Sequence, residues 1–189
     1  MSSIIKVNTY QDANGNALFS SDGSGNLTGT NKLGITHADM WRLSSDKSLT
    51  ANVESVVSAN WEQVDTANFT PIGSSMTESS GIFTFPTTGI WEITYCALFN
   101  GPSQGATYAG GATFISTDNF STETRATEIY SSMYHPSAWT QTVAKHIFDV
   151  TNTSTHKCKF YAVCEFNSTL SGNTSKNRTS VTFIRLGDT

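Results

Sequence analysis

The chain of 189 residues carries a formal net charge of −4, and its 11 Lys and Arg residues form no cluster. Because neutralising phosphates requires clustered cations, this composition argues against a nucleic-acid partner. The chain has no apolar stretch of about 18 residues or more, so we expect no membrane partner, and no signal peptide is visible at its start. We therefore expect a soluble protein that is not exported by the general secretory route.

Charged residues make up only 14% of the chain, compared with about 25% in a typical globular protein. Ser, Thr, Asn and Gly take their place. Such a polar but weakly charged surface is usual among secreted and virion β proteins. The length suits one domain of ordinary size together with an arm.

Residues 1–34 are predicted to be an N-terminal arm or linker. Residues 4–10 have the composition of a strand, whereas residues 12–30 are mostly Gly, Asn, Ser and Asp. The second part has too little apolar area to build its own core, so we expect it to be extended and to become ordered only against its own assembly or a neighbouring protein. The apolar side chains available for that attachment are Ile4, Ile5, Val7, Tyr10, Leu18 and Phe19.

Residues 35–189 are predicted to form one domain that opens with strands. A helix can be drawn through residues 49–61, but the Val-rich composition, the Ser and Asn residues and the absence of caps favour strands with loops. We expect Trp41 and Trp61 to pack into the core or across a subunit seam.

The central segment, residues 81–100, has the pattern of a β-hairpin. Phe83 and Phe85 fall on one face of a short strand, and residues 86–89 read as a turn. From Trp91 to Phe99 apolar residues alternate with other side chains, which indicates a second strand. We predict that the two strands pair with each other.

Four further strands are expected in residues 108–117, 127–134, 138–150 and 179–186, and a fifth in residues 157–166. Gly110 and Gly111 inside the first suggest a bulge or a close backbone approach. In residues 157–166 every second residue is apolar, and that face is assigned to the core. Strands at this spacing with no helix between them predict a sandwich or a barrel.

Two sets of phrases carry a resemblance to a known family. The phrase FTFPTTGIWEITY resembles the F-x-x-P-x-x-G-x-Y/W signature of C1q/TNF-like jelly rolls. The phrases ITHADMWRLSSDKSLT, ANWEQVDT and IGSSMTESSGIFTFP, with the closing DVTNTSTHKCKFYAV and TSVTFIRLGDT, resemble a C1q-like module of virion structural proteins from phages that infect marine cyanobacteria. The resemblance covers residues 35–189. It implies an all-β jelly-roll sandwich that assembles as a homotrimer.

No catalytic or metal-binding pattern stands out. The four histidines are scattered, without the spacing of a metal site, and the G-x-S-x-G turn of a serine hydrolase is absent. Carboxylates such as Glu92, Glu128 and Glu165 could in principle cleave glycosides, but any β protein offers a few. Because the resembling family is not enzymatic, we predict no enzyme, no cofactor and no metal site.

The three cysteines cannot all pair with one another. Cys158 and Cys164 lie six residues apart on one predicted strand, about 20 Å apart at about 3.3 Å per residue, and cannot bridge while that strand is straight. We favour buried free thiols, with a disulfide between Cys96 and one of the others as the alternative.

The resemblance implies a homotrimeric virion protein that is assembled in the cytoplasm of a bacterial host. We expect Tyr95, Phe99, Tyr161 and Phe183 at the trimer interface, because they lie on strands that resemble the inner sheet of the family. The arm would attach the trimer to the major capsid protein or to a tail or connector protein.

Three functions remain open at this stage. A short arm without the long repeats of a fibre shaft favours a capsid decoration or head-fibre protein. The first alternative is a tail-fibre tip or receptor-binding protein that recognises a host surface glycan. The second is a non-viral C1q-like binding module, although a signal peptide or collagen-like stalk is missing ahead of the domain.

Overall fold

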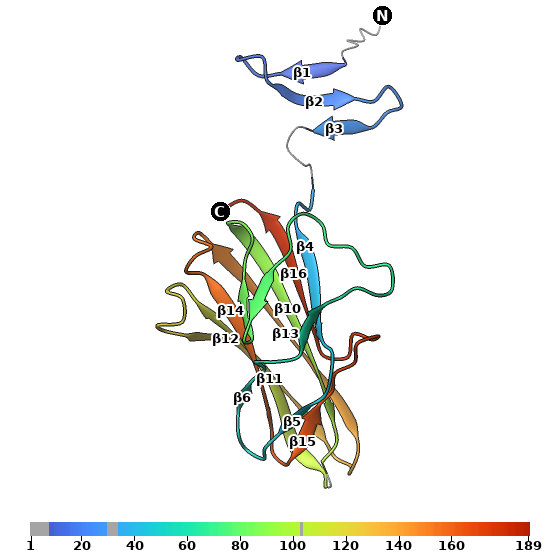
Figure 1. The fold of residues 1–189 in the computed structure, drawn as a ribbon, viewed down its shortest axis with the longest axis vertical. Coiled ribbons are helices and arrows are strands. Elements are labelled where there is room, and N and C mark those ends of the chain that lie inside the picture. Colours follow the sequence, from blue (N-terminus) through green and yellow to red (C-terminus); the bar gives the residue numbers. More distant parts are fainter. Residues whose placement is uncertain (1–7, 30–33, 103) are drawn as a thin grey trace, which may run out of the picture. The chain divides into compact units, whose positions relative to one another are not determined.

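The structure is a computed structural model that describes residues 8–29, 34–102 and 104–189 (Figure 1). The chain divides into two compact units, Met1–Thr36 and His37–Thr189. Within the described residues every regular element is a β-strand, so the predicted all-β class is confirmed. No helix of membrane-spanning length and apolarity occurs among these residues.

The described part of the N-terminal unit is a small antiparallel sheet and not an extended linker. Its strands are β1 (Thr9–Gln11), β2 (Ala17–Ser21) and β3 (Leu27–Gly29), in that order. In each connecting turn an Asp carboxylate accepts bonds from backbone N–H groups two and four residues ahead, Asp12 in the first turn and Asp22 in the second. The described residues of this unit thus form hairpins and are not extended as expected, because these self-bonding turns close hairpins without a core. The role of residues 1–34 as an attachment arm stays a prediction.

The second unit consists of two antiparallel sheets. The seven-stranded sheet contains β4 (Ala38–Leu43), β5 (Lys47–Leu49), β7 (Trp61–Gln63), β10 (Gly89–Asn100), β13 (Trp139–Val150), β15 (Ser168–Leu170) and β16 (Ser180–Gly187). The six-stranded sheet contains β6 (Ser55–Val56), β8 (Thr77–Ser79), β9 (Ile82–Thr84), β11 (Ala106–Ser116), β12 (Thr124–Met133) and β14 (Lys157–Cys164). Residues 49–61 contain no helix, which agrees with the preference for strands.

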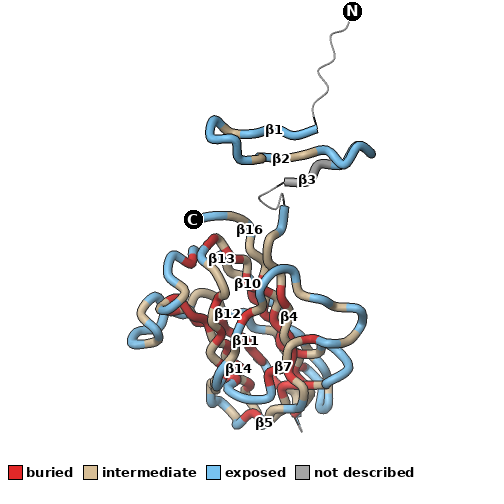
Figure 2. The backbone as a smooth tube through the Cα atoms, turned by 45° about the horizontal axis from the view of Figure 1, so that its top comes forward, coloured by how far each residue is buried: buried red, intermediate tan, exposed pale blue. Residues whose placement is uncertain are grey.

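The core between the sheets is built from aromatic rings. The Phe83 ring contacts those of Trp61, Phe160 and Phe183, with centroids 5.2–5.5 Å apart. Such tilted and edge-to-face contacts add to the apolar area that the rings bury. Figure 2 shows buried residues along the strands and exposed residues in many of the connecting loops. The buried residues of β10 are its odd-numbered ones, and their side chains are those of Trp91, Ile93, Tyr95, Ala97 and Phe99, after Gly89.

The apolar face predicted for residues 157–166 lies in this core. Cys158, Phe160, Ala162 and Cys164 are each at most 1% exposed. All three cysteines are free, and burial raises the pKa of Cys158 and of Cys96. The preferred interpretation as free thiols agrees with the structure, except that Cys96 is only partly buried.

The predicted central hairpin does not form. Strand β9 pairs with β8 and β14 in the six-stranded sheet, whereas β10 pairs with β13, β15 and β16 in the seven-stranded sheet. The connection at residues 85–88 therefore crosses between the sheets. Phe85 contacts Trp91 across the core, with centroids 5.3 Å apart. The crossing places the aromatic residues before and after the connection on opposite sheets. Their rings can then pack against each other in the core, which stabilises the fold.

Two buried polar residues of β4 hold the loops beside the seven-stranded sheet. The carboxylate of Asp39 accepts bonds from the indole of Trp41, the side chain of Gln63 and the backbone N–H of Met76, at 2.8–2.9 Å. The Arg42 guanidinium, which is 0% exposed, donates to Glu62, Asp65 and Thr66. These bonds satisfy polar groups that would otherwise be costly to bury.

Candidate assembly face and candidate binding groove

The outer face of the seven-stranded sheet carries several exposed apolar side chains. Its exposed side chains on β13 include Trp139, Val143 and Ile147, which are 50%, 44% and 60% exposed. A solvated sheet face normally presents polar residues, and contiguous exposed apolar patches mark interaction sites. We define the apolar face by its partly or fully exposed members Ile90, Cys96, Leu98, Val143, Ile147 and Ile184.

The strand register brings apolar and polar members of this face side by side. Cys96 lies opposite Val143 on neighbouring strands, and Glu92 lies opposite Ile147. Glu92 pairs with Lys145 at 3.2 Å, so these two charges compensate each other on the face. The face can therefore be covered by another apolar surface without leaving either charge unpaired.

The four residues predicted at the trimer interface do not lie on this face. Tyr95, Phe99 and Phe183 are each 0% exposed inside the sandwich, so that part of the prediction was wrong. They lie on the expected strands but on the inward side, because neighbouring residues of a strand point to opposite faces. Tyr161 is on the outer face of the six-stranded sheet, where its ring contacts Phe114 at 4.4 Å.

The residues predicted to attach the protein to a particle lie in the N-terminal unit. Ile4, Ile5 and Val7 fall outside the described residues. Tyr10 and Leu18 are 46% and 51% exposed. Phe19 is partly buried, and its ring stacks on that of Tyr10 with centroids 4.3 Å apart. Their role in attachment stays a prediction.

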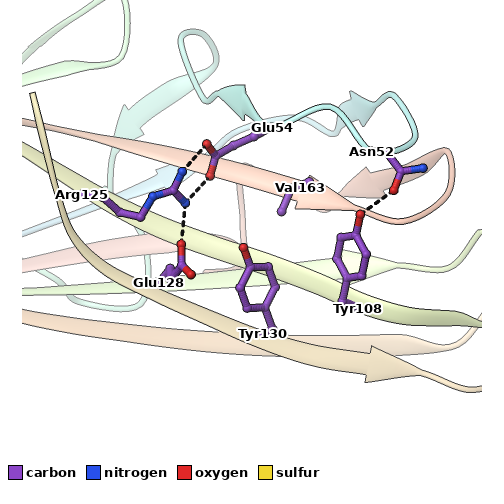
Figure 3. Close-up of a pocket in the computed structure, with 7 residues that line it drawn as sticks. All are labelled: Asn52, Glu54, Tyr108, Arg125, Glu128, Tyr130 and Val163. Atoms are coloured by element: carbon purple, nitrogen blue, oxygen red, sulfur yellow. Dashed lines mark hydrogen bonds and ion pairs between the residues drawn. The ribbon is translucent and has the colours of Figure 1, made fainter.

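A groove of about 470 Å³ lies on the outer face of the six-stranded sheet (Figure 3). It is framed by β11, β12 and β14 and by the segment that leads into β6. Its polar and aromatic lining is Asn52, Glu54, Tyr108, Arg125, Glu128 and Tyr130, with Val163 as an apolar member. Its volume is in the range of small-molecule sites, about 300–1,000 Å³.

One guanidinium organises the charged end of the groove. Arg125 donates two hydrogen bonds of 2.7 Å to the Glu54 carboxylate and one of 2.7 Å to Glu128. Hydrogen bonding to Glu54 raises the pKa of Arg125. The guanidinium carbon also lies 4.8 Å from the centre of the Phe114 ring. The Arg125 guanidinium therefore holds both carboxylates in fixed orientations, and its own position is fixed by stacking on the Phe114 ring.

The other end of the groove is aromatic. Tyr108 and Tyr130 meet edge to face with ring centroids 5.9 Å apart, and the Tyr108 hydroxyl donates to Asn52 (Figure 3). Tyr130 is 51% exposed and lies opposite Gly110 on the neighbouring strand. A Cβ at position 110 would overlap the Tyr130 ring, so the absence of a side chain there lets the ring lie over β11. Burial, and then the charge of Glu128, raise the pKa of Tyr130.

Sequence reasoning did not find this groove. Only Glu128 was noted, and only as one of several carboxylates. Glu54 and Arg125 are 71 residues apart, so their pairing carries no local signal. The doublet Gly110–Gly111 was a usable signal for the groove, because it indicated that another group lies close to this strand. At Gly110 that group is the Tyr130 ring and not a backbone segment as expected.

Comparisons with known proteins identify the fold. No family model matches the chain, and no curated protein matches it either. Among solved structures, Eiger TNF from S. frugiperda is similar over 83% of this chain and 96% of its own, with a TM-score of 0.63 and 7% identity. Murine APRIL at pH 8.0 is similar over 79% and 98%, with a TM-score of 0.56 and 13% identity.

A viral structure is also similar. PRD1 vertex protein P5 matches over 82% of this chain and 100% of its own, with a TM-score of 0.54 and 16% identity. These likenesses establish a TNF-like jelly-roll fold, which confirms the predicted fold class.

Proposed function

We propose that this protein with a TNF-like jelly-roll fold is a homotrimeric, non-enzymatic structural protein of a virus particle. The observation that carries the proposal is the apolar face on β10, β13 and β16. The likeness to PRD1 vertex protein P5 supports the same function.

Three copies could cover the apolar face in a closed ring. In a ring around a three-fold axis each contact joins two different patches, so the apolar face of one copy would pack on another surface of its neighbour. Stable interfaces bury about 1,200–2,000 Å² in total. Val143 and Ile147 lie on β13, which pairs with β10, and are the most exposed members of the face in a single copy, so they would contribute most to assembly.

The N-terminal unit would attach the trimer to the particle. Its described sheet has exposed apolar side chains at Tyr10 and Leu18 and no core of its own. A sheet of three short strands is barely stable alone, so packing against the major capsid protein, or a tail or connector protein, would stabilise it. In this proposal the protein is a capsid decoration or head-fibre protein of a phage, made in the host cytoplasm.

The oligomeric state tests the proposal directly. Light scattering after size-exclusion chromatography should give the mass of three chains for the wild type. Val143→Asp combined with Ile147→Asp should give one chain, because each carboxylate would be buried in the interface. Val53→Asp is the control, since Val53 is 48% exposed and lies outside the apolar face. A wild-type monomer at micromolar concentration would overturn the trimer.

Immunogold labelling of purified particles tests the location. Labels over the head are expected for a decoration or head-fibre protein. Labels at the tail would instead support a fibre tip or a receptor-binding protein. The groove on the six-stranded sheet is the observation that favours this alternative. A protein absent from particles would fit the non-viral binding module and contradict the virion role.

A further inference from the structure

We propose that the groove on the six-stranded sheet binds a neutral hexopyranose unit of a polysaccharide, with its ring stacked on Tyr130. The proposal concerns the outer face that is opposite the apolar face, so it goes beyond the proposed assembly and does not depend on it.

The aromatic end of the groove suits the apolar side of a sugar ring. A pyranose presents C–H groups on its ring faces and hydroxyls around its edge, so it needs a flat apolar partner and polar groups at the side. The Tyr130 ring is half exposed, and Gly110 leaves room for it to lie across the sheet. Tyr108 stands edge-on beside it and Val163 is close by. Rings placed in this way supply much of the contact energy of a binding site.

The charged end suits sugar hydroxyls. Carboxylates are hydrogen-bond acceptors only, and each oxygen accepts more than one bond. Glu54 and Glu128 therefore keep acceptor capacity after pairing with Arg125. Asn52 accepts the Tyr108 hydroxyl through its Oδ1, so its amide nitrogen remains as a donor. Donors and acceptors are both present beside the ring, as a polyhydroxylated ligand requires.

Charge selects a neutral ligand. The groove contains one cation and two carboxylates, and the Arg125 guanidinium already donates three bonds to them. A phosphate, sulfate or uronate would have to compete with both carboxylates for Arg125, at a cost in like-charge repulsion. A neutral sugar accepts and donates bonds without breaking the ion pairs.

The arrangement is fixed before a ligand arrives. Arg125 stacks on Phe114, whose ring contacts Tyr161 at 4.4 Å. Arg125, Phe114 and Tyr161 belong to three neighbouring strands. Binding would therefore lose little side-chain entropy, which favours affinity. Because both carboxylates bind the same guanidinium, neither is placed as a protonated acid for glycoside cleavage, and the site is inferred to bind without hydrolysis.

Saturation-transfer NMR on the full-length protein tests the inference. The probes are the methyl pyranosides of glucose, galactose, mannose and N-acetylglucosamine, each titrated to about 10 mM, the range expected for one stacked ring with a few hydrogen bonds. At least one should receive saturation, strongest at the C–H protons of one ring face. Tyr130→Ala should weaken that binding about tenfold or more, and Tyr130→Phe should keep it because the ring is retained.

Tyr134→Ala is the matched control, since Tyr134 is 85% exposed and does not line the groove. It should bind like the wild type. Failure of all four sugars to receive saturation, or wild-type affinity in Tyr130→Ala, would overturn the inference. A monomeric protein that binds one of the sugars would contradict only the proposed trimer. A trimeric protein that binds none of them would contradict only the proposed sugar site in the groove.

Discussion

The two outer faces of the sandwich differ in how their side chains are held. On the seven-stranded sheet, Val143 and Ile147 are exposed, beside Cys96 and the Glu92–Lys145 ion pair. On the six-stranded sheet, Arg125 is stacked and paired with two carboxylates beside an edge-to-face tyrosine pair. Apolar contacts do not depend on direction, so they can bind the large surface of another protein. Polar groups held in fixed positions around an aromatic ring can bind a small ligand. The difference indicates that one core supports two separate surfaces.

Removing the core contact that both faces share should have the largest effect. Phe83→Ala should lower the free energy of unfolding by about 3–5 kcal/mol, because it leaves a cavity among Trp61, Phe160 and Phe183. Urea denaturation measures the change. Tyr134→Ala, which removes a ring that is 85% exposed, should change stability by less than about 0.5 kcal/mol. Equal losses in both variants would contradict the assignment of Phe83 to a common core.

Asp39→Ala should separate the two faces. It leaves the buried Met76 N–H and the part-buried Trp41 indole without this acceptor, while the Gln63 amide keeps its bond to Ser75. We expect a loss of about 3 kcal/mol, mainly from the unsatisfied donors. Hydrogen exchange should rise in residues 63–76 beside the seven-stranded sheet. The groove should stay protected; faster exchange around Arg125 would show that the faces are coupled.

Gly110→Ala should damage the groove alone. The added Cβ overlaps the Tyr130 ring and must displace it or strain the strand, at about 1–3 kcal/mol. Sugar binding should weaken about tenfold while the oligomeric mass stays unchanged. Gly187→Ala is the matched control, because a Cβ there meets nothing within 4 Å. Unaltered binding in Gly110→Ala would mean that the position of the Tyr130 ring does not matter.

Tyr95→Phe should have the smallest effect and should spare both faces. The Tyr95 hydroxyl is fully buried without a hydrogen-bond partner, and burial raises its pKa. Removing an unsatisfied hydroxyl should leave stability unchanged or increase it by up to about 1 kcal/mol. Thermal denaturation provides the measurement. A clear loss of stability would reveal a buried partner, such as a water molecule, beside Thr142.

Much of the fold could be predicted from local pattern. Alternation in residues 157–166 placed Phe160 and both neighbouring cysteines in the core, and the absence of helical spacing indicated an all-β chain. This works because a strand sends successive side chains to opposite faces, so that its composition alone separates them. The expected class and most strand positions follow from that rule.

The site could not be predicted in the same way. Alternation gives two faces but does not say which is inward, and for this reason Tyr95 and Phe99 were assigned to the wrong side of β10. Likewise the turn after Phe85 could close a hairpin or cross between sheets, and only the packing of Phe85 on Trp91 decides for the crossing.

The amino-acid sequence by itself determined the strand content of this protein and the residues available for its core, because both depend on neighbours along the chain. Tertiary structure alone decided the rest. Glu54 meets Arg125 across 71 residues of chain, and Val143 meets Cys96 across paired strands. Contacts of that range depend on how the sheets pair and pack, which local spacing does not encode.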